Sequence, residues 1–365
     1  MNNLARWPRS VLIAGHLCID IFVPPTFVSE VLLSSTNGAI VSSVGLDLQP
    51  GGAVANVGLC LAGLGHSTVL LGLTGDDFLG IALQKMLERR EMVTSAVQAV
   101  PAHQTSTTIS LIDASSKKYF TLHNTAVNDV FSFSHFESLD LTDVGWLHFG
   151  YPALMSSILQ NGMIELRHIL TAAKSRNIIT SLDLSRVPNG SNIVNFRSNL
   201  NPILPLVDIL APSVEDLLDV PGFFSEDIRA ARSPSNSEIR SVAADFISKG
   251  VLIACIKLGG RGMFIMTSSD EQRMCAIGKC LGKNIKSWLN RQRWVPSRAM
   301  AVMNTVGAGD ALIAGLISSL LHGMAFDQAV NYAQDVAASS LVENACHVGV
   351  SSVPMGSFAF YENSR

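Results

Sequence analysis

Residues 304–317 read NTVGAGDALIAGLI, a turn of small residues followed by an apolar run. The turn Gly307–Ala308–Gly309 has no bulky side chains, so its backbone can bend sharply and approach a ligand closely. The apolar run behind it predicts a buried helix, and the first N–H groups of a helix have no partner within that helix. A helix N-terminus also carries partial positive charge. The segment therefore predicts an anion-binding turn at the start of a buried helix.

Asp310 follows this turn directly and has two interpretations. Aspartate is among the best helix caps, and on this segment alone a cap is the simpler interpretation. A carboxylate beside an anion-binding turn can also take a proton from an attacking hydroxyl group. The rest of the sequence has to decide between the two.

A second glycine turn lies far upstream and reads PGGAVAN over residues 50–56. Apolar residues follow it at helical spacing, at Val54, Val57, Leu61 and Leu64, which predicts one buried helix face. Asn56 lies off that face near the expected helix start, so its amide can bond a ligand. Two glycine turns, each opening a helix and each carrying a polar residue, favour a shared binding site over an isolated cap.

Short apolar, β-rich runs alternate with helix-length segments along the rest of the chain. This alternation predicts an α/β fold with helices covering a mostly parallel central sheet. Two segments, residues 20–48 and about 104–122, contain short strand-like pieces without a helix between them and predict a small antiparallel flap. The runs expected as strands are Val11–Ala14, Val69–Gly72, Trp146–Phe149, Ile178–Asp183, Ile209–Ala211 and Leu252–Leu258.

Three polar segments interrupt the pattern. Residues 185–202 and 221–238 contain Pro and Ser, and we expect long surface loops there. Residues 266–300 carry seven Lys or Arg residues against Asp270 and Glu271. Because charge runs usually face water, we expect a solvated insertion between two edge strands, with a nucleic-acid patch as the alternative.

Length and composition exclude several classes of protein. The chain has 365 residues, 48% hydrophobic and 15% charged, which fits one large domain over residues 1–365 with a sizeable core. Its formal net charge of -3 supplies none of the basic excess that nucleic-acid binding needs. The longest apolar run, Ala311–Phe326, carries Ser318, Ser319 and His322 and is too short to span a bilayer. We therefore expect neither a nucleic-acid nor a membrane partner.

The amino-terminal segment imitates a signal peptide, because Arg6 and Arg9 precede the apolar run Val11–Ala14. Polar residues soon interrupt that run, so we interpret it as a first strand. Six cysteines form no CxxC pair, which favours reduced thiols and a cytoplasmic protein. A pair between Cys275 and Cys280 stays open.

Other motifs carry less weight. The chain has no GxxxxGK[ST] loop, and Gly63–Leu64–Gly65 lacks the third glycine of the dinucleotide pattern. Asp76–Asp77 is best interpreted as a loop with a helix cap, since adjacent side chains rarely converge on one atom. Histidines 16, 103, 123, 148 and 347 show no metal-ligand spacing.

The two glycine segments, in this order and far apart in the chain, resemble the two signatures of the ribokinase-like (PfkB) carbohydrate kinase family. The resemblance covers nearly the whole chain. Residues 15–20, GHLCID, are similar to the opening strand whose aspartate binds sugar hydroxyls, and Trp146–Gly150 matches the end of the central strand. Residues 258–262, LGGRG, resemble the turn beneath the nucleotide.

The resemblance implies a three-layer α/β/α sandwich with a small β-strand lid, and a kinase that phosphorylates a hydroxyl group of a sugar or sugar-like small molecule. Asp310 would be the catalytic base and Gly307, Ala308 and Gly309 the anion hole. ATP and Mg²⁺ would be required. Family members often dimerise through the lid, so the resemblance leaves a homodimer through it open. The acceptor would be held by Asp20, Gly51, Gly52, Asn56 and Asn128, and the nucleotide by Lys257, Gly259 and Gly262.

Three positions depart from the family pattern. Asn304 stands where the family usually has an aspartate that helps to coordinate a monovalent cation, so a requirement for K⁺ stays open. The family's Asn-x-x-Glu element, which organises magnesium-bound water, is represented by Ser213 and Asp216; Asp216 would supply the carboxylate through water. Lys257 stands where a threonine often precedes the nucleotide turn.

Two alternative functions remain at this level. One is a kinase of the same superfamily that phosphorylates a nucleoside or another heterocyclic alcohol. The other is a non-catalytic module that senses a sugar or nucleotide, which the changed positions 213, 216 and 304 allow. The retained Gly307–Asp310 segment argues against the sensor, because sensing needs no base.

Overall fold

The apolar runs of the sequence form a nine-stranded sheet in the computed structural model, which describes residues 9–26, 45–113, 119–187, 195–298 and 306–342. The strand order is β13-β12-β11-β10-β9-β8-β1-β4-β5. All neighbours from β11 to β5 pair in parallel, while β12 and β13 add an antiparallel edge. The strands are β1 Ser10–Gly15, β4 Thr68–Gly75, β5 Val97–Val100, β8 Val144–Gly150, β9 Ile179–Asp183, β10 Ile209–Leu210, β11 Ile253–Lys257, β12 Met263–Thr267 and β13 Gln292–Val295.

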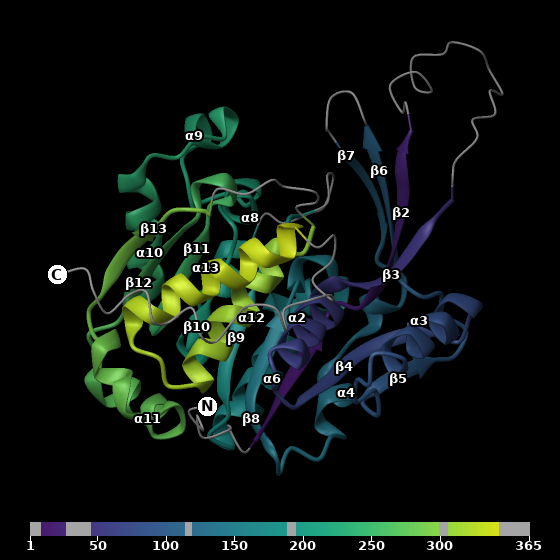
Figure 1. Ribbon diagram of the computed structural model, residues 1–365, viewed down its shortest axis with the longest axis horizontal. Helices are drawn as coiled ribbons and strands as arrows, with labels where there is room; N and C mark the ends of the chain where they lie inside the picture. Colours follow the sequence, from purple (N-terminus) through teal and green to yellow (C-terminus); the bar gives the residue numbers. More distant parts are fainter. Residues whose placement is uncertain (1–8, 27–44, 114–118, 188–194, 299–305, 343–365) are drawn as a thin grey trace.

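Helices cover both faces of this sheet, which confirms the expected three layers (Figure 1). Side chains alternate across a strand, so Val11 and Ile13 of β1 join one apolar core while Leu12 and Ala14 join the other. The first core is closed by α2 Gly52–Gly63, α3 Phe78–Glu88, α11 Glu271–Leu281, α12 Ala308–Leu321 and α13 Phe326–Val342. The second is closed by α4 Phe133–Glu137, α5 Ser156–Leu159, α6 Ile164–Ser175, α7 Phe196–Leu200, α8 Val214–Asp219, α9 Glu226–Ala231 and α10 Asn236–Ser248.

A four-stranded lid stands away from the layered body (Figure 1). Its strands are β2 Cys18–Thr26, β3 Asp47–Gly51, β6 Thr107–Asp113 and β7 Tyr119–Asn124, in the order β3-β2-β6-β7. The sequence predicted an antiparallel lid. That prediction is wrong in one place, because β2 and β6 pair in parallel. Both strands leave the body in the same direction, and each pairs with an antiparallel neighbour, β3 or β7, that returns toward it.

The segments expected as loops contain helices. Residues 185–202 include α7, and residues 221–238 include α9 and the first turn of α10, whose capping box is made by Ser235 and Glu238. Serines therefore mark the starts of α9 and α10, at Ser225 and Ser235, while α7 begins after Asn195. The basic segment 266–300 does join the two edge strands β12 and β13, as predicted, but it folds into α11 and buries Met274, Ile277 and Trp288.

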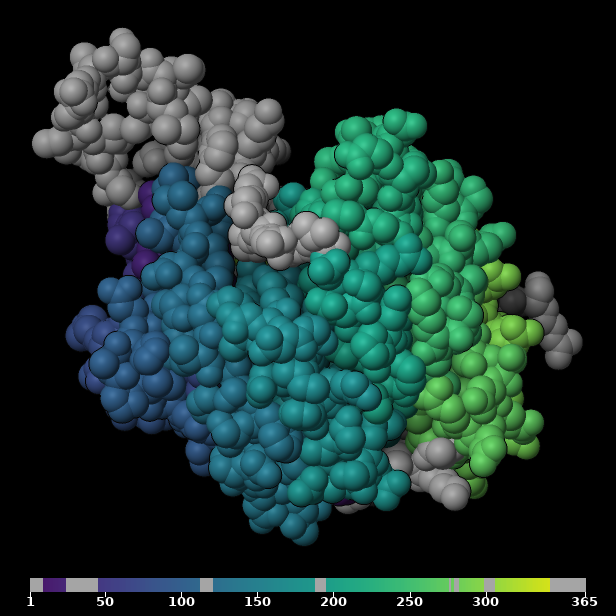
Figure 2. Space-filling model, turned by 180° about the vertical axis from the view of Figure 1, so that it is seen from behind, coloured from purple at the N-terminus to yellow at the C-terminus, as the bar shows by residue number. Residues whose placement is uncertain are grey.

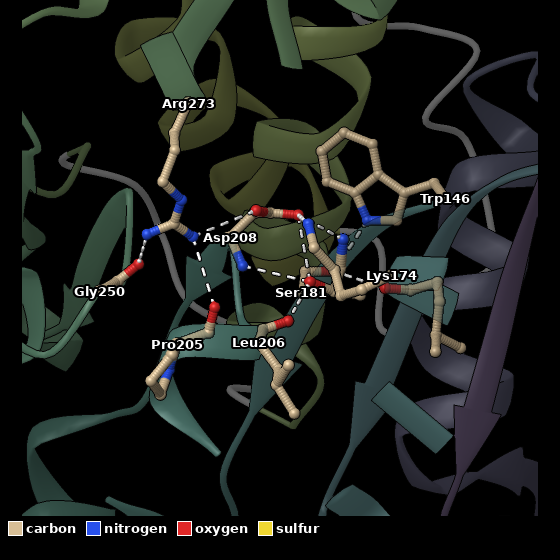
Figure 3. A network of polar contacts seen from close by, with 10 residues as sticks. Trp146, Lys174, Ser181, Pro205, Leu206, Asp208, Gly250 and Arg273 are labelled. Carbon is tan, nitrogen blue, oxygen red and sulfur yellow. Dashed lines mark hydrogen bonds and ion pairs between the residues drawn. The ribbon is translucent and has the colours of Figure 1, made fainter. Parts of the chain in front are cut away.

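A buried carboxylate at the amino ends of the strands ties several elements together (Figure 3). Asp208 accepts hydrogen bonds from the backbone N–H of Thr180 at 2.9 Å and from Lys174 Nζ at 2.6 Å. Arg273 approaches the other carboxylate oxygen to 3.9 Å and donates to the carbonyl of Gly250 at 2.6 Å. Because Asp208 precedes β10, it lies at the edge of the sheet formed by the amino ends of the strands. Ligands of open α/β sheets bind at the opposite edge, at the carboxyl ends.

Seen from behind, the surface passes from purple and blue amino-terminal residues on one side through teal to green carboxy-terminal residues on the other (Figure 2). None of the helices in the described residues is long and apolar enough to cross a membrane. Of the thiols in the described part of the chain, Cys18, Cys60, Cys255 and Cys275 are free. The Cys280 side chain and Cys346 lie outside the described positions.

Candidate active site

Asp310 lies in the first turn of α12 and is not its cap. The N-cap is Gly307, whose left-handed backbone (φ 79°, ψ −5°) suits glycine, and no side-chain cap is present among the described residues. The interpretation of Asp310 as a helix cap is therefore wrong. Gly307, Ala308 and Gly309 are each partly exposed, so the start of α12 is open to a ligand.

The two glycine segments meet through a hydrogen bond. The Asn56 amide in α2 donates to Asp310 Oδ2 over 2.9 Å, although the two residues are 254 positions apart. The Tyr151 hydroxyl donates to the same carboxylate and lies 2.8 Å from both oxygens. Asp310 is thereby held between the starts of α2 and α12 and the end of β8.

Asp20 lies in β2 close to the second glycine turn. A Cβ atom on Gly51 would come within 2.2 Å of an Asp20 carboxylate oxygen, so only glycine leaves room for this approach. The Cys18 thiol donates to Asp20 Oδ1 at 3.2 Å. The pKa of Asp20 is raised to about 6, first by burial and second by the negative charge of Asp310, while hydrogen bonds from Cys18 and Thr108 oppose the rise. The second effect requires the two carboxylates to lie near each other, so Asp20, Asn56 and Asp310 form one site.

Two histidines link the body to the lid beside this site. His16 follows β1 and His123 lies in β7, and their Nε2 atoms are 3.2 Å apart, so one ring donates to the other. His123 Nδ1 contacts the Thr108 hydroxyl at 3.0 Å, while His16 Nδ1 is buried without a partner among the described residues. Burial lowers the pKa of both rings. A Cβ on Gly52 would lie 2.6 Å from His16 Nδ1, so Gly52 is needed to seat this ring.

A buried ion pair lies on the other side of Asp310. Lys257, at the end of β11, donates to both oxygens of Asp183 at the end of β9, over 2.8 and 2.7 Å. A Cβ built on Gly309 would lie 3.4 Å from Lys257 Nζ, which places the ammonium beside the start of α12. Asp216 is also buried, and its Oδ2 accepts from the Ser213 backbone N–H in the capping box of α8.

Several carboxylates share this one lysine. Burial raises the pKa of Asp183, Asp216 and Asp310, and Lys257 opposes the rise in each case. Burial disfavours the charged form of Lys257, but Asp183, Asp216 and Asp310 together raise its pKa, so the ammonium stays protonated. Three buried carboxyl groups, those of Asp183, Asp216 and Asp310, thus interact with the ammonium of Lys257 near the start of α12.

The predicted nucleotide turn follows Lys257 directly. Gly259 and Gly262 have positive φ angles of 55° and 91°, which favour glycine. A Cβ on Gly259 or Gly260 would meet nothing within 4 Å, so this side of the turn faces open space. Arg261 points back to the body and donates to the Asn236 side chain at 2.6 Å.

Asn128 is placed differently from the other predicted acceptor residues. Its side chain is fully buried in the 3-10 helix η1 Ala126–Val130, where it accepts from the Leu17 N–H at 3.3 Å and donates to the Leu17 carbonyl at 2.9 Å. It therefore fixes the backbone between His16 and Cys18, and a direct contact with the acceptor has no support in this geometry. Asn304 lies outside the described residues.

Sequence reasoning missed Tyr151, Asp183 and the His16–His123 contact. Tyr151 follows Gly150 and Asp183 closes β9, so both stand at the carboxyl ends of predicted strands, which was the available signal. The partners of these residues come from other strands and helices, which no local pattern reveals. His123 gave no comparable signal, because its neighbour depends on how the lid folds.

The chain is similar to known carbohydrate kinases in sequence and in fold. Residues 18–350 match the pfkB family carbohydrate kinase. The chain is 22% identical over 302 residues to the pseudouridine kinase of Escherichia coli K12, covering 81% of each chain. It is 25% identical over 278 residues to a fructokinase of Klebsiella pneumoniae, covering 75% of this chain and 78% of the relative. The solved structure of Arabidopsis thaliana ribokinase complexed with ribose and ATP has a similar fold, with a TM-score of 0.65 at 18% identity over 93% of this chain and 94% of that one.

Proposed function

Because the chain belongs to the pfkB family of carbohydrate kinases, we propose that it transfers the γ-phosphoryl group of ATP to a hydroxyl group of a sugar or sugar-like small molecule. Asp310 is the general base and the start of α12 is the anion hole. The observation that carries the proposal is the hydrogen bond between Asn56 and Asp310, because it joins the expected acceptor segment to the carboxylate beside the helix start.

Asp310 takes the proton of the acceptor hydroxyl as that oxygen bonds to the γ-phosphorus and the bond from the γ-phosphorus to the leaving ADP oxygen breaks. Burial raises the pKa of this carboxyl, against the effects of Lys257, Tyr151 and Asn56. A base whose pKa lies closer to neutral is better matched to proton transfer at physiological pH.

The start of α12 and Lys257 stabilise the charge on the transferred group. The N–H groups of the first helical turn and the ammonium beside Gly309 meet the phosphoryl oxygens from one side. Asp183 holds the ammonium through two hydrogen bonds, so little reorganisation is needed during the reaction. Lys257, Gly259 and Gly262 bind the nucleotide.

Asp20, Gly51, Gly52 and Asn56 hold the acceptor. The two glycines let Asp20 and His16 approach the start of α2, and the Asp20 carboxylate accepts hydrogen bonds from acceptor hydroxyls. Asn128 contributes indirectly, by fixing the Leu17 backbone that leads into β2. The lid, once closed on the acceptor, excludes water and limits hydrolysis of ATP.

Mg²⁺ fits this donor set as an ion held mostly by phosphates and water. In the described residues no group of three His, Cys, Asp or Glu side chains is arranged to hold a metal. Mg²⁺ commonly keeps several waters and binds through one or two carboxylates plus substrate phosphates. Asp216 has one carboxylate oxygen outside its bond to the Ser213 backbone N–H, and would bind the ion through water. When bound, Mg²⁺ neutralises charge on the phosphates; a monovalent cation near Asn304 stays a proposal from the family resemblance.

A screen for ADP release across pentoses, hexoses, hexose phosphates and nucleosides tests the proposal and names the acceptor. We expect Asp310→Asn to lower kcat by about 10²–10⁴-fold, because it removes the base while keeping the shape of the side chain. Nucleotide affinity, measured by calorimetry, should change little. Asp140→Asn is the control, since this exposed aspartate bonds Thr142 in a surface turn. Unchanged turnover in Asp310→Asn would remove Asp310 from the mechanism.

A nucleoside or another heterocyclic alcohol is the second candidate acceptor. The observation in its favour is a group of rings beside Asp310: the His16 ring centroid lies 4.9 Å from that of His123 and 6.2 Å from that of Tyr151. A planar heterocycle packs well against such rings. The same screen separates the candidates, because kcat/KM for nucleosides should then exceed that for free sugars.

A further inference from the structure

Tyr151 has an unusual backbone conformation at the carboxyl end of the central strand β8. Its φ and ψ angles of 64° and 45° are left-handed, a region that β-carbon-bearing residues seldom adopt. Residues held in such a conformation carry backbone strain, and they cluster at functional sites. The Tyr151 N–H donates to the Asp183 carbonyl at 3.2 Å, which fixes the turn to the neighbouring strand β9.

The side chain of Tyr151 reaches Asp310 with its hydroxyl group. One phenolic proton lies between two carboxylate oxygens, each 2.8 Å from the Tyr151 hydroxyl oxygen. Asn56 donates to Oδ2 from the opposite element. These donors come from the residue after β8 and from α2, while the carboxylate belongs to α12, so its orientation is set from outside its own helix before an acceptor arrives.

We propose that Tyr151 is a positioning residue for phosphoryl transfer, whose hydroxyl holds the Asp310 carboxylate in orientation and keeps it ionised. This inference rests on the proposed function, since it needs Asp310 to act as the base. Tyr151 itself exchanges no proton with the acceptor and forms no bond to phosphorus.

The electrostatics of the site give this hydrogen bond its effect. Burial raises the pKa of Asp310, and hydrogen bonds from Tyr151 and Asn56 favour the charged form. Burial and the charge of Asp310 raise the pKa of Tyr151 well above its usual value, so its proton stays on the phenol. The titratable groups facing the pair are Lys257 of β11, Asp183 of β9, Asp216 of α8, Asp20 and Cys18 of β2, Cys60 of α2, and His16 after β1.

Tyr151→Phe removes the hydroxyl and leaves the ring. Without this donor the carboxylate of Asp310 keeps Asn56 but loses Tyr151 as a hydrogen-bond partner, and its pKa rises. We expect the acidic limb of the pH profile of kcat/KM to move up by about one pH unit, so that activity on that limb falls about tenfold more than at the optimum. If Tyr151 contributed only the packing of its ring, Tyr151→Phe would leave the acidic limb of the kcat/KM profile unchanged.

Tyr332→Phe is the matched control. Tyr332 lies in α13, is also mostly buried, and bonds Ser318, which follows Asp310 by eight residues in α12. At a rise of 1.5 Å per residue, the two positions are about 12 Å apart along the helix. This variant removes a comparable hydroxyl hydrogen bond without touching Asp310, so its pH profile should match that of the wild type.

A second measurement needs no acceptor. The chain has four tyrosines, so the protein labelled with ¹³C at tyrosine Cζ gives few signals, and Tyr151→Phe identifies the one from Tyr151. We expect that signal to shift with pH as Asp310 ionises, with an inflection above the ordinary aspartate pKa, and to lose this inflection in Asp310→Asn. The spectrum of Tyr151→Phe also reports whether the variant is folded.

The outcomes separate the two proposals. A Tyr151 signal without inflection, or one that Asp310→Asn leaves unchanged, overturns the inference, as does an unmoved acidic limb in Tyr151→Phe. If Asp310→Asn keeps full turnover, the proposed function fails instead. A strong loss in Asp310→Asn together with an unmoved limb in Tyr151→Phe leaves the kinase mechanism standing and removes Tyr151 from it.

Discussion

His148 is buried in β8 and its ring makes the free energy of unfolding depend on pH. Its Nδ1 contacts the Ser181 hydroxyl at 2.9 Å, and its Nε2 has no partner among the described residues. Burial, aided by the charge of Lys257, lowers its pKa to about 3. In the unfolded chain a histidine has a pKa of about 6.5. Between these values the unfolded chain binds a proton that the folded chain does not, so this residue destabilises the fold as the pH falls.

We predict that His148→Asn removes this pH dependence. From pH 7 to pH 5 the stability of the wild type should fall relative to that of the variant by about 2 kcal/mol, at about 1.4 kcal/mol per pH unit below 6.5. Urea unfolding at the two pH values measures the difference. The pKa values of Asp20 and Asp216 are raised to about 6, so these two groups stabilise the fold as the pH falls. Both are present in the wild type and in His148→Asn, so the difference in stability between the two proteins isolates the effect of His148.

His168→Asn is the control for this prediction. His168 is exposed on α6 and packs edge-on against Phe133. This variant should follow the wild-type pH dependence. Equal slopes for the wild type and His148→Asn would show that the folded protein accommodates a charged ring at position 148.

At the scale of single residues, the sequence identified the site residues that belong to short motifs. Gly51, Gly52, Asn56 and the segment 307–310 stand in short motifs, and the structure brings them together. Tyr151 and Asp183 stood at strand ends without a motif, and their partners Asp310 and Lys257 come from other elements. Such contacts depend on strand order, which a single sequence does not encode in any short window.

Among the elements, the Asp208 network joins β9, β10, α6 and α11 at the amino edge of the sheet (Figure 3). Removing a buried carboxylate leaves the Thr180 N–H without its partner, and such a loss costs about 1–3 kcal/mol or more. We predict that Asp208→Ala lowers the free energy of unfolding by about 2–4 kcal/mol, measured by urea denaturation.

The same variant should leave the specific activity of the folded protein unchanged, because Asp208 lies at the edge opposite the carboxyl strand ends. Arg291→Gln is the comparison, since its ion pair with Asp327 is exposed and should contribute less than about 1 kcal/mol. A cost in Asp208→Ala no larger than in Arg291→Gln would contradict the structural role of Asp208.

Elements with a strong apolar pattern were the predictable ones. All six expected runs appear as strands, because buried parallel strands are nearly continuous apolar runs. The short helices α7 and α9 were hidden by Pro- and Ser-rich sequence that resembles loops. The parallel pairing of β2 with β6 was also missed, since it follows from where both strands leave the body and not from their residues.

For the molecule as a whole, we predict a homodimer formed through the lid. The lid presents two edge strands, β3 and β7, and Leu122 of β7 is 62% exposed. An unpaired edge with an exposed apolar residue is suited to pairing with another chain. Light scattering should give twice the mass of the chain, and Leu122→Lys should shift the protein toward the monomer. A monomer at every accessible concentration would defeat this prediction.

The position of β1 has a consequence for how the protein is made. Of the strands in the described sheet, β1 (Ser10–Gly15) is synthesised before the others, yet it lies inside the sheet between β4 and β8. The β4 side can close early, but the β8 side stays open until Val144–Gly150 has been synthesised. Throughout that interval the nascent chain displays an unpaired apolar edge, the kind of surface that chaperones cover during translation.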